Sequence, residues 1–374
     1  DDARMGGTSG CVETGAFGNE AYILQGYFNL PKILELTLYD GYDHVGGHQL
    51  GLHTGFAKDF NSYEEFFEAY KKQIKYFVDI KVAGSNVIEQ IFAQYMPAPF
   101  LSILTNDCIK KGKDYNAGGA RYNTNYIQGV GIGTITDSLA AIKYNCFDHH
   151  NFTMEELVEA MDHNFEGYDR IYHLVTHKTP KYGNDDDYAD DIMKDIFTYY
   201  RDCVTGRPNT KGGFYRINML PTTCHVYFGE VMNASPNGRL AHKPVSEGIS
   251  PEKGADIYGP TGVINSCAKM DQLSTGGTLL NQKFTPSVLA GDTGLDQFAN
   301  LIRAYFNMDG HHIQLNVIDR KTLLAAQANP EEYKDLIVRV AGYSDHFRNL
   351  SKELQDEIIN RTEQSFDDYN DAGS

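Results

Sequence analysis

Gly10-Cys11-Val12-Glu13-Thr14 lies near the start of this 374-residue chain, and Arg339-Val340-Ala341-Gly342-Tyr343-Ser344 lies near its end. The first segment places a thiol two positions before a carboxylic acid. The second places a glycine between a small residue and an aromatic one. These two segments say more about the chain than the rest of its sequence, and a fold that uses both must bring the two ends together.

The chemistry of the two segments predicts a radical relay. Glycine suits a backbone radical because no side chain prevents its α-carbon from becoming planar. That carbon also lies between an electron-donating nitrogen and an electron-withdrawing carbonyl. A cysteine sulfur can pass a hydrogen atom to such a carbon, and a thiyl radical can take one from an unactivated C–H bond. We therefore expect Gly342 to store the radical and Cys11 to use it, in a site closed to water and oxygen.

The two segments resemble the signature pair of the glycyl radical enzymes, the superfamily of pyruvate formate-lyase and the diol and choline lyases. A single cysteine followed two positions later by glutamate resembles the eliminating branch, which removes water, an amine or sulfite. With Gly15-Ala16-Phe17-Gly18 after it, the loop is most similar to the hydroxyproline dehydratases, whereas choline and glycerol relatives typically have proline in place of Thr14. The resemblance covers residues 1–366. Further matching strings are Gly131-Ile132-Gly133-Thr134, Asn237-Gly238-Arg239 and residues 311–317.

The fold that the resemblance implies is α/β: the C-terminal half of a ten-stranded glycyl radical enzyme barrel, surrounded by helices. Catalytic subunits of the superfamily are longer than this chain and carry the cysteine loop near the middle. The implied domains are a half-barrel with the cysteine loop at 1–308, a glycyl radical domain at 309–366, and an unassigned tail at 367–374. Alternation of apolar helices with short glycine-bounded strands also favours an α/β architecture.

Three further side chains have expected roles in the site. Glu13 would assist loss of a hydroxyl, since a carboxyl in a dry pocket has a pKa suited to proton exchange near neutrality. Tyr27 and Thr222 would touch the substrate, as the resemblance to hydroxyproline dehydratases implies, although Tyr27 also fits a core tyrosine and Thr222 a strand-end hydroxyl. No metal site is expected, because the spacing of His44, His48 and His53 fits no common metal-binding helix.

The resemblance implies a lyase that dehydrates trans-4-hydroxy-L-proline to a pyrroline-5-carboxylate under anaerobic conditions. No bound cofactor is expected. The partner would be an activating enzyme with an iron–sulfur cluster and S-adenosylmethionine, which installs the radical at Gly342. Two alternatives stay open. The substrate could be isethionate, a diol or choline, or the chain could be a non-catalytic half that complements a partner.

The composition limits the other partners. A net charge of −17 argues against nucleic acid, because no basic stripe is present to displace counterions from phosphates. No run of 18 apolar residues is present, so no membrane span is expected. Six widely spaced cysteines without a Cys-x-x-Cys pair favour a reducing, cytoplasmic location. The oligomeric state stays open, with a homodimer as one option.

Local patterns predict the scaffold. Ser62-x-x-Glu65 and Thr153-x-x-Glu156 are typical helix starts. The acidic stretch 184–191 is predicted to be a solvated loop. A final helix at about 351–362 should cover the glycine segment.

Overall fold

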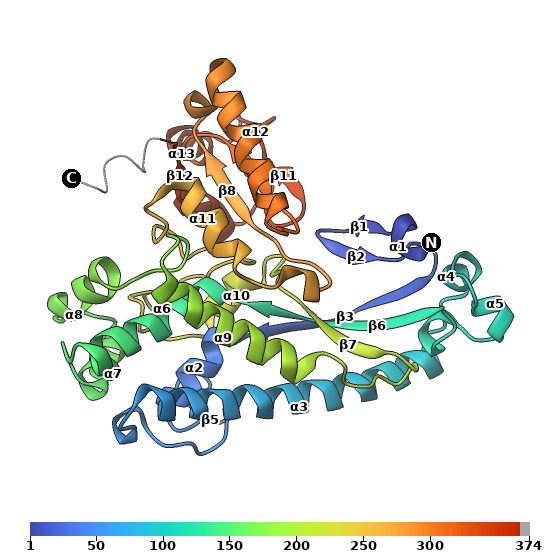
Figure 1. The fold of residues 1–374 in the computed structure, drawn as a ribbon, viewed down its shortest axis with the longest axis horizontal. Helices are drawn as coiled ribbons and strands as arrows, with labels where there is room; N and C mark the ends of the chain where they lie inside the picture. The colour runs from blue at the N-terminus through green and yellow to red at the C-terminus, as the bar shows by residue number, and fades with distance from the viewer. Residues whose placement is uncertain (367–374) are drawn as a thin grey trace.

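The computed structural model describes residues 1–366, so the expectation of an unassigned tail at 367–374 falls outside the described residues. The described part is a mixed α/β structure with small sheets and many helices (Figure 1). The expected α/β class is therefore confirmed. The largest sheets among residues 1–366 have three strands each.

The first sheet runs across the middle of the molecule in Figure 1 and is parallel throughout. Its order is β3-β6-β7, formed by β3 (Glu20–Asn29), β6 (Tyr122–Val130) and β7 (Phe214–Asn218). A register shift between Leu24 and Tyr27 interrupts the pairing of β3 with β6, and Gly26 within it has φ of +97°. A bulge of this kind re-aims the side chains that follow it, here Tyr27.

Each of the two long strands leads directly into a buried helix. β3 continues into α2 (Leu30–Leu38), and Asn29 caps that helix by accepting a hydrogen bond from the Lys32 amide at 3.1 Å. β6 continues through Gly131, at φ +85°, into α6 (Ile132–Ile142). A left-handed turn of this kind favours glycine, so the glycine string of this segment is a structural turn between strand and helix.

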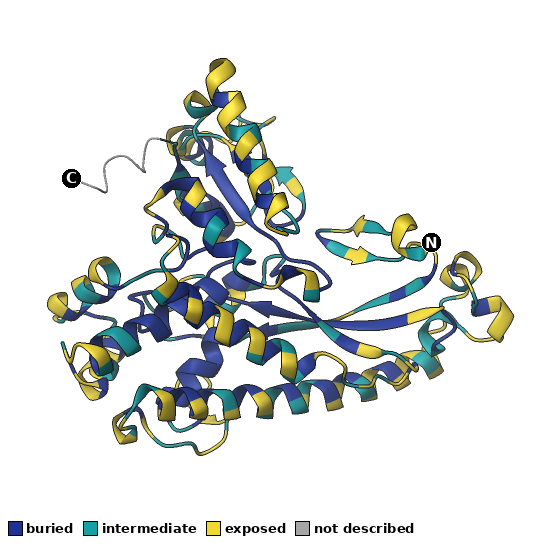
Figure 2. Ribbon diagram, in the orientation of Figure 1, coloured by how far each residue is buried: buried dark blue, intermediate teal, exposed yellow. Residues whose placement is uncertain are grey.

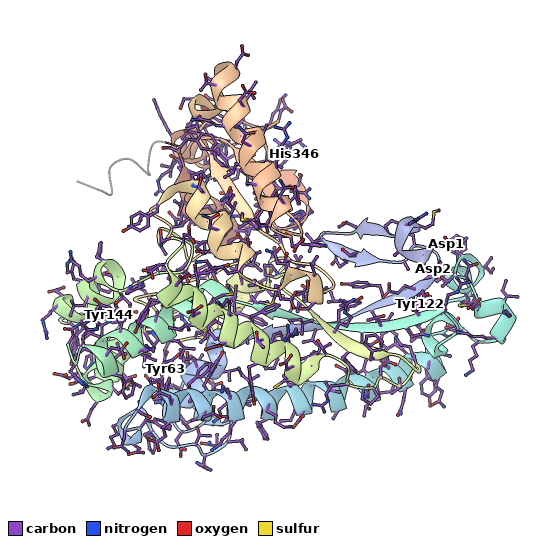
Figure 3. The ribbon with its side chains drawn as sticks, viewed as in Figure 1. Asp1, Asp2, Tyr63, Tyr122, Tyr144 and His346 are labelled. Carbon is purple, nitrogen blue, oxygen red and sulfur yellow. The ribbon has the colours of Figure 1, made fainter. Side chains whose placement is uncertain are left out.

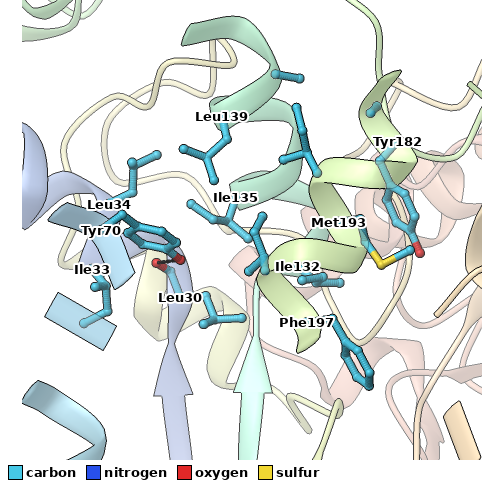
Figure 4. Packing of buried hydrophobic residues seen from close by; sticks show 14 of the residues in the cluster. Leu30, Ile33, Leu34, Tyr70, Ile132, Ile135, Leu139, Tyr182, Met193 and Phe197 are labelled. Carbon is cyan, nitrogen blue, oxygen red and sulfur yellow. Dashed lines mark hydrogen bonds between the residues drawn. The ribbon is translucent and has the colours of Figure 1, made fainter. Parts of the chain in front are cut away.

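The main core lies where α2 and α6 pack against two longer helices, α3 (Tyr63–Tyr95) and α9 (Asp187–Val204). Figure 4 shows its centre, where aliphatic side chains of α2 and α6 meet Tyr70 of α3 and Met193 of α9. Figure 2 shows the burial concentrated on the inward faces of these helices. The remaining helices of this part are α4 (Pro99–Leu104), α5 (Cys108–Lys111), α7 (Met154–Asp162), α8 (Asp169–His173) and α10 (Cys224–Glu230).

The second three-stranded sheet lies in the upper part of Figure 1 and is also parallel. Its order is β12-β8-β9, formed by β12 (Glu363–Gln364), β8 (Asn281–Phe284) and β9 (Gln314–Val317). A parallel bridge between Met219 and Thr278 joins the end of β7 to the segment that leads into β8. The helices around this sheet are α11 (Gly259–Ala268), α12 (Gly291–Asn307), α13 (Arg320–Ala328) and α14 (Lys352–Asn360).

Three two-stranded hairpins complete the structure. Two of them carry the segments that decided the sequence analysis. They are β1 (Gly7–Ser9) with β2 (Glu13–Gly15), and β10 (Ile337–Arg339) with β11 (Ser344–His346). The third is β4 (Tyr42–Asp43) with β5 (His48–Gln49). A short helix, α1 (Asp2–Met5), precedes β1.

Both expected helix starts are confirmed, and one local expectation is wrong. Ser62 caps α3, and Thr153 with Glu156 forms a complete capping box at the start of α7. The acidic stretch 184–191, however, already enters α9 at Asp187. Asp190 in it is fully buried and accepts hydrogen bonds from Ser266 and Lys269. The charge run looked solvated because its partners lie far away in the sequence.

Candidate active site

The cysteine lies at the tip of the first hairpin, which points toward the middle of the molecule (Figure 1). The tip turns at Gly10, where φ is +62°. Glu13 folds its carboxylate back over the turn, so that Oε2 accepts hydrogen bonds from the amides of Cys11 at 2.7 Å and Val12 at 2.9 Å. The glutamate therefore shapes the loop that presents the thiol.

Two contacts dock this hairpin on the rest of the molecule. The Thr14 amide donates to the Gly276 carbonyl at 2.8 Å, and the Thr14 hydroxyl lies 2.7 Å from Nε2 of His311. At the outer end, Tyr122 donates to Asp2 at 2.9 Å, and Figure 3 shows these two residues close to the chain start. The hairpin is thus held at both ends.

An apolar cluster joins the hairpin to the glycine segment. It consists of Val12, Leu220, Leu279 and Ala341, all fully buried, with Cys11 packed against it. These residues come from the first hairpin, the end of β7, the approach to β8 and the turn of the last hairpin. The cluster excludes water from the space between the two turns.

Gly342 occupies the turn between β10 and β11, with φ of +84°. A Cβ added at this position would lie 2.1 Å from Cys11 Cβ and 2.5 Å from Cys11 Sγ. Such approaches exclude any side chain, so the α-carbon of Gly342 and the thiol of Cys11 are in direct contact. The structure therefore brings together the two residues that the sequence placed at opposite ends of the chain.

The thiol of Cys11 is held in its protonated form. Burial raises its pKa, the nearby Glu13 carboxylate raises it further, and the positive charge of Arg339 acts in the opposite direction. A protonated thiol carries the hydrogen atom that a radical can take, whereas a thiolate has none. The environment of Cys11 therefore suits hydrogen-atom transfer better than nucleophilic attack.

Tyr27 and Thr222 also lie together. The Tyr27 hydroxyl is 2.9 Å from the Thr222 hydroxyl, and Thr222 has φ of +54°. Burial raises the pKa of Tyr27, the hydrogen bond with Thr222 lowers it, and the nearby Glu13 carboxylate also raises it. Tyr27 thus shares the environment of the cysteine hairpin and stays a neutral hydroxyl that can donate or accept.

One cavity lies away from these residues. Its volume is about 570 Å³, and Asp137, Lys181 and Arg239 are among the residues that line it. A cavity of about 340 Å³ adjoins the cysteine hairpin and is lined by Gly10 and Glu13, together with side chains of β3. The carboxylate side of the hairpin is therefore open to a small molecule.

Several side chains that support the glycine turn are not among the residues that the sequence predicts for the site. Gln314 accepts a hydrogen bond from the Gly342 amide at 3.0 Å, and Arg361 donates to the Val340 carbonyl at 2.8 Å. Asn316 bonds both the amide and the carbonyl of Arg339. Residues 311–317 match the superfamily, but nothing in their residue types alone indicates these contacts.

Within residues 1–366, no group of three or more histidine, cysteine, aspartate or glutamate side chains is arranged to hold a metal ion. None of the helices in the same range combines the length and the apolar character that crossing a bilayer requires.

Comparison with known families agrees with the site. Residues 1–229 match the family model described as pyruvate formate lyase-like, and residues 245–348 match the model described as glycine radical. The chain therefore belongs to the pyruvate formate lyase-like glycyl radical enzymes. The superfamily expected from the two segments is confirmed.

Individual relatives sharpen this assignment. Trans-4-hydroxy-L-proline dehydratase of Clostridioides difficile is 68% identical over 366 residues, which make up 98% of this chain and 46% of that protein. The crystal structure of the hydroxyproline dehydratase from that organism, with trans-4-hydroxy-L-proline bound, matches with a TM-score of 0.96 over the same shares of the two chains. The glycerol-bound B12-independent glycerol dehydratase from Clostridium butyricum matches with a TM-score of 0.94 at 42% identity, covering 98% of this chain and 46% of that one. The chain thus spans about half the length of the relatives it matches.

Proposed function

We propose that this chain is the part of a glycyl radical dehydratase that carries both radical residues, and that the enzyme converts trans-4-hydroxy-L-proline to a pyrroline-5-carboxylate. The observation that carries the proposal is the contact between the Cys11 thiol and the Gly342 backbone. The 68% identity to trans-4-hydroxy-L-proline dehydratase supports the choice of substrate.

In this reaction Cys11 takes one hydrogen atom from the substrate and returns it to the product. Gly342 loses its α-hydrogen atom to an activating enzyme that contains an iron–sulfur cluster and S-adenosylmethionine. The Gly342 radical then takes the hydrogen atom of the Cys11 S–H bond, which restores the glycine and leaves a thiyl radical. The thiyl radical takes a hydrogen atom from the substrate carbon next to the C–O bond. After the hydroxyl has left as water, the product radical takes the hydrogen atom back from Cys11.

Three side chains assist this sequence in the proposal. Glu13 exchanges the proton that lets the hydroxyl leave as water. Its Oε2 holds the cysteine turn, and the side chain lines the cavity beside the hairpin, where it can meet a substrate. Tyr27 and Thr222 form one polar pair beside the hairpin, which would orient the substrate hydroxyl or carboxylate.

The arrangement of the strands supports a barrel half as the finer description of the fold. Five parallel strands, β3, β6, β7, β8 and β9, follow one another through two sheets and the bridge between Met219 and Thr278. The far end of α3 and the adjoining α4 expose many large apolar side chains, an unusual surface for a protein that works alone. These side chains are Ile88, Ile91, Phe92, Tyr95, Met96, Phe100, Leu101, Ile103 and Leu104. We propose that a second polypeptide portion covers them and supplies the other five strands.

The domain boundaries belong to the same proposal, with the half-barrel at 1–308 and the glycyl radical domain at 309–366. A separate apolar cluster supports this division. With the exception of Val226, its buried members lie in 309–366: Leu323, Ala326, Val338, Val340, Phe347, Leu354, Ile358 and Ile359. The enzyme would be cytoplasmic, with a small-molecule substrate and the activating enzyme as partners, without a nucleic-acid partner, and with a homodimer as one possible assembly.

The test is anaerobic activation of the chain together with the portion of the Clostridioides difficile relative that it does not match. Electron paramagnetic resonance should show a glycyl doublet, and trans-4-hydroxy-L-proline should be consumed with formation of a pyrroline-5-carboxylate. Isethionate, glycerol and choline serve as competing substrates. Turnover of one of these in place of hydroxyproline would contradict the substrate, and a folded complex without any doublet would contradict the radical function.

A further inference from the structure

Gln314, the first residue of β9, uses all of its hydrogen-bonding groups on the glycine turn and its surroundings. Its Oε1 accepts from the Gly342 amide at 3.0 Å and from Nε of Arg339 at 3.0 Å. Its Nε2 donates to the Val340 carbonyl at 3.2 Å and to the side chain of Asn281. Gln314 itself is only 5% exposed. A single buried amide therefore holds the glycine and the arm that leads to it.

The orientation of this amide follows from its partners. The Gly342 amide and the Arg339 guanidinium are donors only, and the Val340 carbonyl is an acceptor only. A flipped side chain would place two donors against its NH₂ group and an acceptor against its oxygen. The arrangement with Oε1 facing Gly342 is therefore the one that the partners require.

We propose that Gln314 is a positioning residue for the glycyl radical, an inference that rests on the proposed function. A radical at the α-carbon of Gly342 is stabilised only while that carbon and the adjacent peptide groups share a plane. The hydrogen bond to Gln314 fixes the plane of the Ala341–Gly342 peptide. It also polarises the N–H bond of that peptide, which leaves more electron density on the nitrogen. The same bond sets the direction of the Cα–H bond relative to Cys11 Sγ.

Asn316 provides a matched control on the same strand. It lies two residues after Gln314, so both side chains lie on one face of β9. It is 6% exposed and holds the Arg339 amide at 2.8 Å and the Arg339 carbonyl at 2.7 Å. Asn316 thus steadies the arm of the turn without touching Gly342. A role in folding alone predicts similar effects for both residues, whereas positioning of the radical predicts an effect specific to Gln314.

The experiment compares Gln314→Leu, Gln314→Glu and Asn316→Leu in the activated enzyme, with ¹⁵N-labelled glycine. The measured quantities are the nitrogen hyperfine coupling of the doublet and the turnover per radical. We expect Gln314→Leu to change the coupling and to lower turnover per radical on the order of 10- to 100-fold, because misplacement of reacting atoms is costly. Gln314→Glu retains an acceptor for the Gly342 amide and should restore most of both quantities. Asn316→Leu should lower the melting temperature and change the coupling and the turnover per radical far less than Gln314→Leu does.

The outcomes separate this role from the radical function as a whole. If the wild type shows a doublet and Gln314→Leu has the same nitrogen coupling and turnover per radical as the wild type, the role of Gln314 is overturned and the radical function is not. A wild type without a doublet would overturn the proposed function and this role with it. If Gln314→Leu fails to fold, Gln314→Asn replaces it. Faster hydrogen exchange at the Gly342 amide together with an altered nitrogen coupling would then support the role of Gln314. Wild-type values of both quantities would overturn it.

Discussion

The cysteine turn and the glycine turn meet in space but are held in different ways. The cysteine turn is held by its own glutamate, by the Thr14 amide on Gly276 and by the Thr14 hydroxyl beside His311, and Cys11 is partly exposed. The glycine turn is buried and is held by Gln314 of β9 and by Arg361, which directly follows α14. The difference fits a division of labour. The residue that stores the radical is enclosed by buried side chains, and the residue that acts on the substrate stays partly exposed in a turn that its own glutamate shapes.

Gly342→Ala should break the relay at its storage end. The added methyl group would overlap the Cys11 side chain, and an alanine at φ +84° costs about 1–2 kcal/mol of backbone strain. We expect no glycyl doublet and no turnover, with a lower melting temperature.

Gly84→Ala is the control for the glycine substitution. Gly84 lies exposed within α3, and a Cβ at that position meets no atom within 4 Å. This change should leave the doublet intact and stabilise the helix by about 0.5–1 kcal/mol. A full doublet in Gly342→Ala, measured by electron paramagnetic resonance, would place the radical elsewhere.

Cys11→Ser should separate the two turns chemically. A serine O–H bond is too strong for a glycyl radical to break, so the radical should form at Gly342 and remain there without turnover. Cys203→Ser, in α9 and distant from the site, is the matched control and should keep wild-type activity. Spin counting and a substrate assay on the same sample measure both quantities. Turnover by Cys11→Ser would show that another group abstracts the hydrogen atom.

Arg361→Leu should loosen the glycine turn without touching the cysteine turn. Arg361 pairs with the buried Glu357 at 2.9 Å, and its removal leaves that carboxylate with the longer pairing to Lys253 at 3.7 Å, at a cost of up to about 3–5 kcal/mol. The exposed pair of Arg348 and Glu331 should contribute about 0–1 kcal/mol, which makes Arg348→Leu the control. Denaturant unfolding measures both variants. Equal effects would contradict the importance of the buried pair.

The same pair predicts a pH dependence. Burial acts to raise the pKa of Glu357, but Arg361 and Lys253 outweigh it, and the pKa lies well below its ordinary value. Below the ordinary pKa of glutamate, the unfolded chain binds the proton first. The stability that this carboxylate provides is therefore complete at neutral pH and is lost as the pH falls through the lowered value. In Arg361→Leu the free energy of unfolding should therefore depend less on pH in the acid range.

The sequence predicted the relay but not its support. Cys11 and Gly342 could be found because each lies in a short segment whose chemistry has few other uses, and the helix starts at Ser62 and Thr153 are local signals. Gln314 could not be found, since a glutamine in a short strand of alternating polar and apolar residues is ambiguous until the partner that it bonds is known. Asp190 was misjudged for the same reason, because its partner Ser266 lies on another helix. The chemistry of a short segment can be predicted from the sequence, whereas contacts between side chains that are distant in the chain cannot.

The smallest expected effect concerns the ionisation of Cys11 itself. Burial and the Glu13 carboxylate raise the pKa of this thiol, and Arg339 lowers it. Titration of the unactivated protein with a thiol reagent, taken as the difference from Cys11→Ser, should therefore show a midpoint above that of free cysteine, about 8.5. Glu13→Gln should shift the midpoint down, because it removes a negative charge, and Arg339→Met should shift it up. Opposite shifts in these two variants would show that neighbouring charges contribute to the pKa of the Cys11 thiol. Unchanged midpoints in both would mean that burial alone holds the proton on the thiol.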